Sequence, residues 1–151
     1  MLPNSTPTGY GASVRASGSH KPIDASTGAY RAGHPPPPLE AFVAFVARCS
    51  RVRTGTLMCA VVLLDRLRAR LPKEARGQAC TAHRLFLASL VIAGKCISDY
   101  WPVNTHWVEH KLGFPASEIS LMERQMLRLL DYSLAIDEAH LVSVAVRFLP
   151  P

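Results

Sequence analysis

The chain has 151 residues, of which 48% are hydrophobic, so it is long and apolar enough to form one domain with a single core. Its net charge of +6 permits contact with nucleic acid or an acidic partner but identifies neither. The longest apolar run, Leu57 to Leu64, is too short for a membrane span, and residues 1–20 lack the apolar segment of a secretory signal, so we expect an intracellular protein.

Residues 1–38 predict a disordered tail. They hold seven of the 12 prolines and five of the nine glycines, with almost no large apolar side chains. Such a segment cannot bury enough surface to offset the loss of chain entropy on folding. Pro35 to Pro38 predicts a stiff polyproline spacer that leads into the folded domain, which we expect over residues 39–149.

From residue 39 onward, apolar residues recur at spacings of three and four, which is typical of amphipathic helices. The first helix is expected over residues 39–52. The second is expected to begin at Thr54 or Thr56, either of which could cap it. The predicted buried face of this second helix consists of Leu57, Met58, Val61, Leu64 and Leu67.

The third predicted helix, Thr81 to Asp99, is apolar on all sides, and such a helix belongs inside other helices. Thr81 is expected to cap its start. Lys95 interrupts the pattern, because it follows Val91 and Ile92 at spacings of four and three and so lies on an apolar stripe. A charge at that position has to reach solvent, form an ion pair or face a partner.

Three shorter helices are expected after it. The first begins at Asn104 or Thr105 and ends at Gly113. Ser117 is expected to cap the second, whose predicted inner face is Ile119, Met122, Met126, Leu129 and Leu130. Asp137 is expected to cap the last, which runs over Leu141, Val144, Ala145 and Phe148. No stretch shows sustained alternation of period two, so the predicted fold class is all-α.

Cysteine usage points to a reducing compartment. No two cysteines form a C-x-x-C pair, and three of them fall within apolar helical patterns. We therefore expect the cysteines to behave as small buried hydrophobic residues. They are Cys49, Cys59, Cys80 and Cys96.

Four stretches carry a resemblance to the cyclin box. They are T-G-T-L-M-C-A-V-V-L-L-D-R-L at 54–67, C-T-A-H-R-L-F-L-A-S-L-V-I-A-G-K-C-I-S-D at 80–99, N-T-H-W at 104–107 and E-I-S-L-M-E-R-Q-M-L-R-L-L-D-Y-S-L at 118–134. They are similar to the Pcl/Pho80 branch of fungal cyclins, and within it to the G1/S Pcl type. The resemblance covers about residues 39–136. It implies a single five-helix cyclin box, here followed by one additional C-terminal helix.

The resemblance also implies a function. Cyclins are regulatory subunits without catalysis of their own, which bind and activate a cyclin-dependent protein kinase. For this branch the implied pairing is of the Pcl/Pho85 type, in cell-cycle or nutrient and phosphate signalling, in the nucleus, the cytoplasm or both. No cofactor and no metal is implied. The kinase-contact residues that carry over are Lys95, Glu123, Leu127, Tyr132 and Leu134.

The residues themselves are compatible with these implied roles. Lys95 lies near a helix C-terminus, where the helix dipole favours a cation. Glu123 follows Ile119 by four residues, so it flanks the inner face of its helix. The two charges could meet at the edge of the third and fifth helices, either as an ordinary ion pair worth ~0–1 kcal/mol or as a kinase contact. Gly94 departs from the Ala or Ser usual in cyclins and is expected to cost about 1 kcal/mol of helix propensity.

Two rival interpretations stay open. The basic residues between Arg48 and Arg76 could track phosphates in a cyclin-fold nucleic-acid-binding or transcription-factor module, although a solvated basic face is the plainer interpretation. Residues 106–110 spell H-x-x-E-H, a zinc metalloprotease pattern. A catalytic zinc site needs a third protein ligand, and the competing prediction for this segment is a short helix in which Trp107 packs inward.

Overall fold

The computed structural model describes residues 36–104, 106–109 and 112–149. Most of the predicted tail, residues 1–35, lies outside these ranges. Within them the chain forms no β-strand, which confirms the all-α class. The helices are α1 (Leu39–Cys49), α2 (Thr54–Arg70), α3 (Thr81–Ile97), α4 (His106–Glu109), α5 (Ala116–Leu129) and α6 (Glu138–Ala145), followed by a 3-10 turn, η1 (Val146–Phe148).

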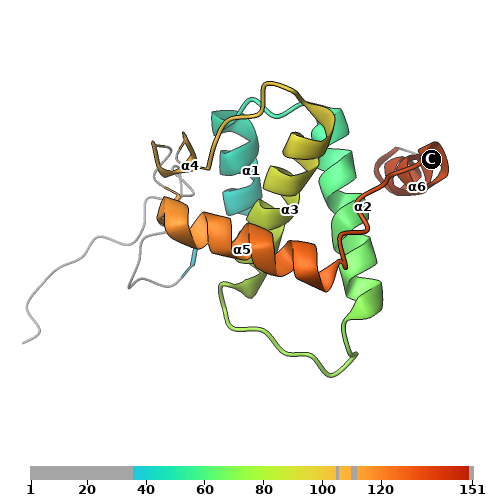
Figure 1. Ribbon diagram of the computed structural model, residues 1–151, viewed down its shortest axis with the longest axis horizontal. Coiled ribbons are helices and arrows are strands. Elements are labelled where there is room, and N and C mark those ends of the chain that lie inside the picture. The colour runs from blue at the N-terminus through green and yellow to red at the C-terminus, as the bar shows by residue number, and fades with distance from the viewer. Residues whose placement is uncertain (1–35, 105, 110–111, 150–151) are drawn as a thin grey trace, which may run out of the picture.

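Helix α3 is the centre of the fold. It contacts α1, α2 and α5, and Figure 1 shows it between α1 and α2 with α5 running across the group. Leu87, Leu90 and Val91 are fully buried, and burial is continuous from Phe86 to Gly94. The prediction of a helix enclosed by other helices is therefore confirmed. None of the described helices is long and apolar enough to cross a membrane.

The buried face of α2 differs from the predicted one. Of the five residues expected inside, Leu67 is buried, whereas Leu57, Met58, Val61 and Leu64 are half-buried. The residues that enter the core are Thr56, Cys59, Ala60, Val62, Leu63 and Leu67. The prediction failed because residues 57–64 are apolar without interruption, so their spacing does not mark one face.

Two predicted helix caps are replaced by backbone contacts. Helix α5 begins at Ala116, because the Pro115 carbonyl already accepts hydrogen bonds from the amides of Glu118 and Ile119, at 3.0 and 3.1 Å. Ser117 is therefore inside the helix. Thr81 is likewise the first residue of α3, and its amide donates to the Gln78 carbonyl at 2.9 Å.

Of the remaining predictions of helix starts and caps, one is confirmed. Helix α2 starts at Thr54 after Arg53, with no side-chain cap from either Thr54 or Thr56. Helix α4 starts at His106, whose amide donates to the Val103 carbonyl at 3.0 Å, so it does not begin at Asn104, and Thr105 lies outside the described residues. The Asp137 prediction is confirmed, because its carboxylate accepts from the amide of His140 at 2.8 Å.

The end of α1 and the positions of two apolar residues also differ from prediction. Helix α1 ends at Cys49 rather than at residue 52, because Arg51 adopts a left-handed conformation with φ 48°. Leu129, expected on the inner face of its helix, is 47% exposed, and Phe148, expected within the last helix, is 57% exposed. Phe148 lies in η1, beyond the end of α6. At the end of α5 the buried position is taken by the next residue, Leu130, which is fully buried.

The four cysteines are free thiols with different surroundings. Cys59 is buried, Cys49 and Cys80 are half-buried, and Cys96 is exposed, so the prediction of burial is wrong for Cys96. Burial raises the pKa of the Cys59 thiol, and the nearby Cys96 thiol raises it further. Partial desolvation also raises the pKa of Cys96, so both side chains are protonated at neutral pH.

The chain makes firm contact with the helices from Pro37 onward. Pro37 is buried, and its carbonyl oxygen lies 2.7 Å from Nε2 of His83 on α3. The His83 ring also packs edge-on against Phe42 of α1, with ring centroids 5.1 Å apart. These contacts fix the entry of the chain into α1 beside the start of α3.

Candidate functional site

Lys95 and Glu123 form a two-pronged ion pair between α3 and α5. Lys95 Nζ donates to Glu123 Oε1 at 2.7 Å and to Oε2 at 2.8 Å. The Lys95 side chain remains 41% exposed, whereas that of Glu123 is 14% exposed. The predicted meeting of the two charges at the edge of the third and fifth helices is therefore confirmed. The cation is the outer member of the pair and the carboxylate the inner one.

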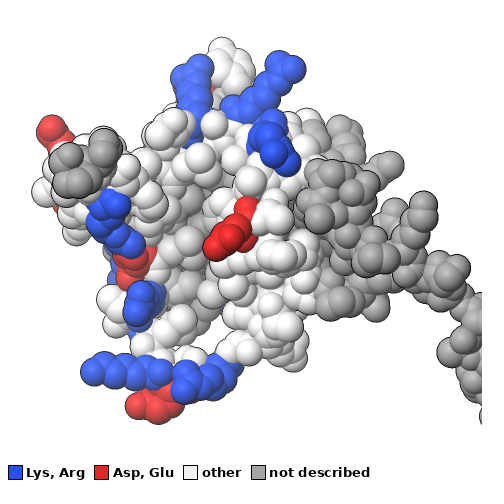
Figure 2. Space-filling model, turned by 180° about the vertical axis from the view of Figure 1, so that it is seen from behind, with Lys and Arg blue, Asp and Glu red and all other residues white. Residues whose placement is uncertain are grey.

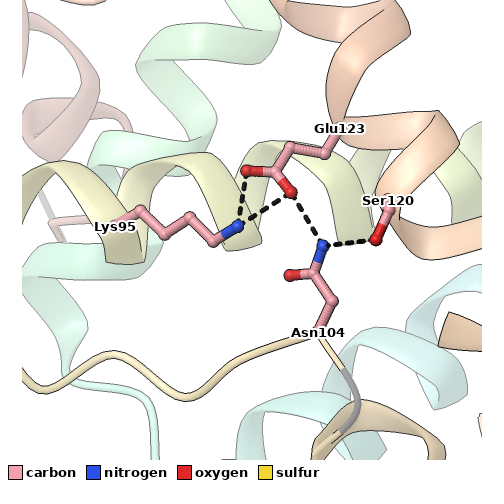
Figure 3. Close-up of polar contacts among 4 residues, drawn as sticks. All are labelled: Lys95, Asn104, Ser120 and Glu123. Atoms are coloured by element: carbon pink, nitrogen blue, oxygen red, sulfur yellow. Dashed lines mark hydrogen bonds and ion pairs between the residues drawn. The ribbon is translucent and has the colours of Figure 1, made fainter. Parts of the chain in front are cut away.

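A third residue, Asn104, completes this arrangement (Figure 3). Its Nδ2 donates to Glu123 Oε2 at 2.8 Å and to Ser120 Oγ at 3.0 Å. Ser120 and Glu123 are three residues apart on α5, so they lie on the same side of that helix. Asn104 comes from the segment between α3 and α4, which ties three parts of the chain together at one carboxylate. We call these four residues, Lys95, Asn104, Ser120 and Glu123, the edge cluster.

The helices hold the edge cluster because their other faces are buried. Lys95 directly follows the buried run of α3, and Glu123 directly follows Met122, which is 3% exposed. Moving either charged residue would require moving a close-packed core. The ammonium also lies in the last turn of α3, where the exposed carbonyl groups favour positive charge.

Gly94 has a packing role that the sequence did not reveal. A Cβ atom at Gly94 would overlap the indole ring of Trp101, so this ring occupies the space that a side chain would fill. Trp101 also lies against Trp107 of α4, with ring centroids 5.7 Å apart, and Trp107 is fully buried as predicted. The segment after α3 is thereby folded back onto the helix, which places Asn104 beside α5.

Of the other three predicted contact residues, Leu127 is in the last turn of α5, and Tyr132 and Leu134 lie in the segment that follows it. Leu127 and Leu134 are half-buried and pack against the core, while Tyr132 is 65% exposed. The Tyr132 amide donates to the Leu127 carbonyl at 2.9 Å, which joins these two residues through the backbone. Leu127 also follows Glu123 by four residues, so it continues the same side of α5. Of the three side chains, that of Tyr132 is the most accessible.

Arg66 of α2 holds the segment on which Tyr132 and Leu134 lie. Its guanidinium donates to the carbonyl of Ser133 and, at 2.9 Å, to that of Ala135, so the two bonds flank Leu134. The preceding residues Asp131 and Tyr132 both have left-handed backbone conformations, with φ of 51° and 53°. Such conformations are unfavourable for non-glycine residues and persist where surrounding contacts fix them.

The surface near Lys95 carries exposed apolar side chains. Ile97, Tyr100 and Val103, all in or just after the end of α3, are 50%, 95% and 70% exposed. Contiguous exposed apolar patches are typical of surfaces that bind other proteins, whereas single exposed apolar residues are common on any protein. In the sequence, these three residues lie between Lys95 and Asn104 of the edge cluster.

A second ion pair joins the same two helices away from these residues. Arg84, in the first turn of α3, pairs with Glu118, in the first turn of α5. The Arg84 guanidinium also lies 6.0 Å from the centre of the Phe114 ring. Both side chains are about one third exposed, at 28% and 32%. This pair offers a natural comparison with Lys95 and Glu123.

The basic residues between positions 48 and 76 are spread along the molecule. Figure 2 shows basic side chains gathered at the upper edge and along the side and lower edge of one face, with mostly uncharged surface between them. Arg48 is in the last turn of α1 and Arg53 directly precedes α2, whereas Arg70 is the last residue of α2 and Arg76 lies in the loop after it. This distribution fits solvated helix ends better than a continuous phosphate-binding stripe.

The metalloprotease pattern acquires no third ligand in the part of the chain that the structure describes. There, no group of three His, Cys, Asp or Glu side chains lies close enough together to hold a metal ion. His110, the last residue of the pattern, is outside the described residues. Trp107, in the middle of the pattern, belongs to the core.

The sequence identified the charged pair but not its supports. The sequence places Asn104 at a helix start and Arg66 near a helix end, and it predicts none of the contacts of Asn104, Ser120 or Arg66. Their contacts join residues that are between 16 and 69 positions apart in the chain, so no local periodicity could reveal them. The N-T-H-W stretch at 104–107 was the available signal, since it placed Asn104 within a segment typical of the family.

Comparison with known proteins identifies the fold that carries this site. Residues 38–135 match the family model "Cyclin, N-terminal domain". Three proteins of Saccharomyces cerevisiae are similar: PHO85 cyclin-1 is 38% identical over 107 residues, PHO85 cyclin-2 is 36% identical over 118, and PHO85 cyclin-9 is 35% identical over 117. These alignments cover 70%, 78% and 77% of the chain but 38% of each relative, so the chain matches less than half of their length. No solved structure matches the chain significantly. With its all-α fold, its ion pair between α3 and α5 and this family match, the chain belongs to the cyclin family.

Proposed function

We propose that this protein is the regulatory subunit of a cyclin-dependent protein kinase and has no catalytic activity of its own. The kinase is of the type that pairs with PHO85 cyclins, because three similar proteins carry that name. The complex would form inside the cell, in the nucleus, the cytoplasm or both, and act in cell-cycle or nutrient and phosphate signalling. Four free cysteines support a reducing compartment.

The observation that carries this proposal is the asymmetry of the Lys95–Glu123 pair. An ion pair that served stability alone would contribute ~0–1 kcal/mol at a surface position. Here the Glu123 side chain is only 14% exposed while the Lys95 side chain remains 41% exposed, which supports a donor held at the surface for a partner. The proposed kinase-contact residues are Lys95, Glu123, Leu127, Tyr132 and Leu134.

Activation would proceed by a shift of population. A kinase exchanges between inactive and active arrangements of its mobile helix, and a partner that binds the active arrangement more tightly increases its population. A rigid surface suits this role, because it selects one arrangement rather than adapting to both. The phosphoryl-transfer chemistry belongs to the kinase.

The test is a calorimetric titration of the purified chain with a PHO85-type kinase, using Lys95→Ala and Glu123→Ala. Truncating one partner of a buried charged pair in an interface costs about 2–5 kcal/mol, so each change should weaken binding by tens- to thousands-fold. Melting temperatures should stay near that of the wild type, because both residues flank the core rather than fill it.

The matched controls are Arg84→Ala and Glu118→Ala, which break the other ion pair between the same two helices. They should leave kinase affinity within about threefold, since surface pairs of this kind contribute little. If all four variants bind the kinase like the wild type, the assigned contact residues are wrong. If the wild-type chain fails to bind the kinase but binds DNA or RNA with a steep salt dependence, the nucleic-acid alternative takes its place.

A further inference from the structure

Asn104 makes an unusual set of contacts for a residue near the protein surface. Its carboxamide nitrogen donates both to Glu123 Oε2, at 2.8 Å, and to Ser120 Oγ, at 3.0 Å. The orientation of the amide is fixed by charge, because turning it over would direct its oxygen at the Glu123 carboxylate. Both amide hydrogens are therefore committed to one side of α5.

The oxygen of the Asn104 amide, in contrast, lacks a hydrogen-bond partner among the described residues. This atom, Oδ1, is buried. A buried acceptor without a donor costs folding free energy, and most buried polar atoms in proteins avoid it. Asn104 is therefore a poor choice for stability alone. Its contribution has to be sought in what it does to Glu123.

The contacts of Asn104 and Lys95 hold the Glu123 carboxylate in one orientation. Asn104 binds Oε2 from one side, and Lys95 Nζ binds both oxygens from the other (Figure 3). An ammonium group donates up to three hydrogen bonds and accepts none. Two of the Lys95 hydrogens are directed at the Glu123 oxygens, so one remains to donate to another acceptor. A lysine side chain is ordinarily among the most flexible, and binding it in one conformation has an entropic cost.

We propose that Asn104 is a positioning residue for kinase recognition: through Glu123, it fixes the Lys95 ammonium at the surface before the partner arrives. The remaining ammonium hydrogen would bind an oxygen acceptor on the kinase, a backbone carbonyl or a carboxylate. Ordering the side chain in advance removes part of the cost of binding. This inference rests on the proposed function, because it assigns the kinase as the partner of Lys95.

The test is a double-mutant cycle on kinase affinity. It compares four proteins: the wild type, Asn104→Ala, Lys95→Ala and the variant with both changes. With Lys95 present, Asn104→Ala should weaken kinase binding by roughly two- to tenfold, the range expected for losing one pre-ordered side chain. In the Lys95→Ala background, titrated to saturation, it should have no further effect, because the two residues act as one unit. The melting temperature of Asn104→Ala should change by only a few degrees, because removal of the unpaired oxygen offsets part of the loss of the bonds to Ser120 and Glu123.

A measurement without the kinase provides an independent check. In the wild type, the ¹⁵N relaxation of the Lys95 ammonium should report an ordered group, and in Asn104→Ala a mobile one. Ser120→Ala is the matched control: it removes the other acceptor of Asn104 and should leave Lys95 ordered, because the bond to Glu123 remains.

The outcomes separate this inference from the function on which it rests. If Lys95→Ala abolishes binding while Asn104→Ala binds like the wild type, Asn104 has no positioning role and the proposed function stands. An equal loss from Asn104→Ala in both backgrounds would mean a role that does not act through Lys95 and would overturn the inference. If Lys95→Ala itself binds normally, both the contact assignment and this inference fail.

Discussion

Charged residues form ion pairs both at the α3–α5 edge and on the α2–α6 side of the molecule. The two regions differ in how deeply the helices that carry these residues are buried in the core. At the α3–α5 edge, Lys95 and Glu123 stand on helices whose other faces are buried in the core. On the α2–α6 side, α6 has one buried residue, Val144, and Figure 1 shows α6 set apart beside α2. There, the ion pair between Asp65 and Arg147 is about half exposed, at 42% and 54%.

This difference separates a surface that can present charges precisely from one that cannot. Residues that extend from a close-packed core keep their positions, and binding sites depend on that precision. Elements with little buried area open locally at low free energy. We therefore expect the α3–α5 edge to be as stable as the whole domain, and α6 with η1 to open first. The following substitutions test the contrast from its strongest effect to its weakest.

The largest effect is expected for Leu90→Ala in α3. Leu90 is fully buried at the centre of the core, so the change should leave a cavity and cost roughly 2–5 kcal/mol of unfolding free energy. Urea unfolding followed by circular dichroism would measure it. Leu129→Ala is the control, because Leu129 is 47% exposed and should change stability by no more than about 0.5 kcal/mol. Equal effects of the two changes would contradict the central position of α3.

The next effect is expected for Gly94→Ala, beside Lys95. By helix propensity alone, the change should stabilise the protein by about 1 kcal/mol. The Trp101 ring occupies the space of the new methyl group, however, and overpacking of this kind typically costs about 1–3 kcal/mol. The net result should be a destabilised protein with altered tryptophan fluorescence. Gly55→Ala is the matched control: nothing lies within 4 Å of its added Cβ, so it should be neutral or stabilising.

Gly94 also illustrates what the sequence could and could not predict. Composition and spacing predicted α3, its burial on all sides and the presence of a charge at its end, because these depend on local periodicity. The position of Trp101 over Gly94 depends on how the segment after α3 folds back, which no local rule describes. From the sequence alone, Gly94 is interpreted only as a cost in helix propensity. The structure shows that the Trp101 ring fits against α3 because Gly94 has no side chain.

The same limit explains the errors at helix faces and ends. In α2, the unbroken apolar run does not indicate which face of the helix is buried. Contacts with α3 and α6 determine which of its residues enter the core. The starts of α3 and α5 use backbone carbonyls of Gln78 and Pro115 where serine or threonine caps were expected. For the site, the charged pair was predictable from the family resemblance, whereas Asn104 and Arg66 were not, because their partners are distant in sequence.

A smaller effect is expected for Arg66→Met, which removes the bonds to the Ser133 and Ala135 carbonyls while keeping most of the side-chain volume. Hydrogen bonds from charged donors contribute about 1.5–3 kcal/mol where buried, and partial exposure should reduce this to about 1 kcal/mol. The loss should be local. Hydrogen exchange should accelerate in residues 133–145 and remain unchanged in α3. Uniform acceleration across both regions would mean that Arg66 supports the whole domain.

The smallest effect is expected for Arg147→Ala, which breaks the pair between η1 and α2. An exposed pair contributes ~0–1 kcal/mol, and salt screens it, so the melting temperature should fall by a few degrees at most in low salt and not at all in high salt. Asp65→Ala should reproduce this result, since both changes remove the same contact. A loss well above 1 kcal/mol that persists in high salt would contradict the comparison. In that case the α2–α6 side would be as stable as the α3–α5 edge, and the rigidity of the edge would no longer support our proposal that it binds a kinase.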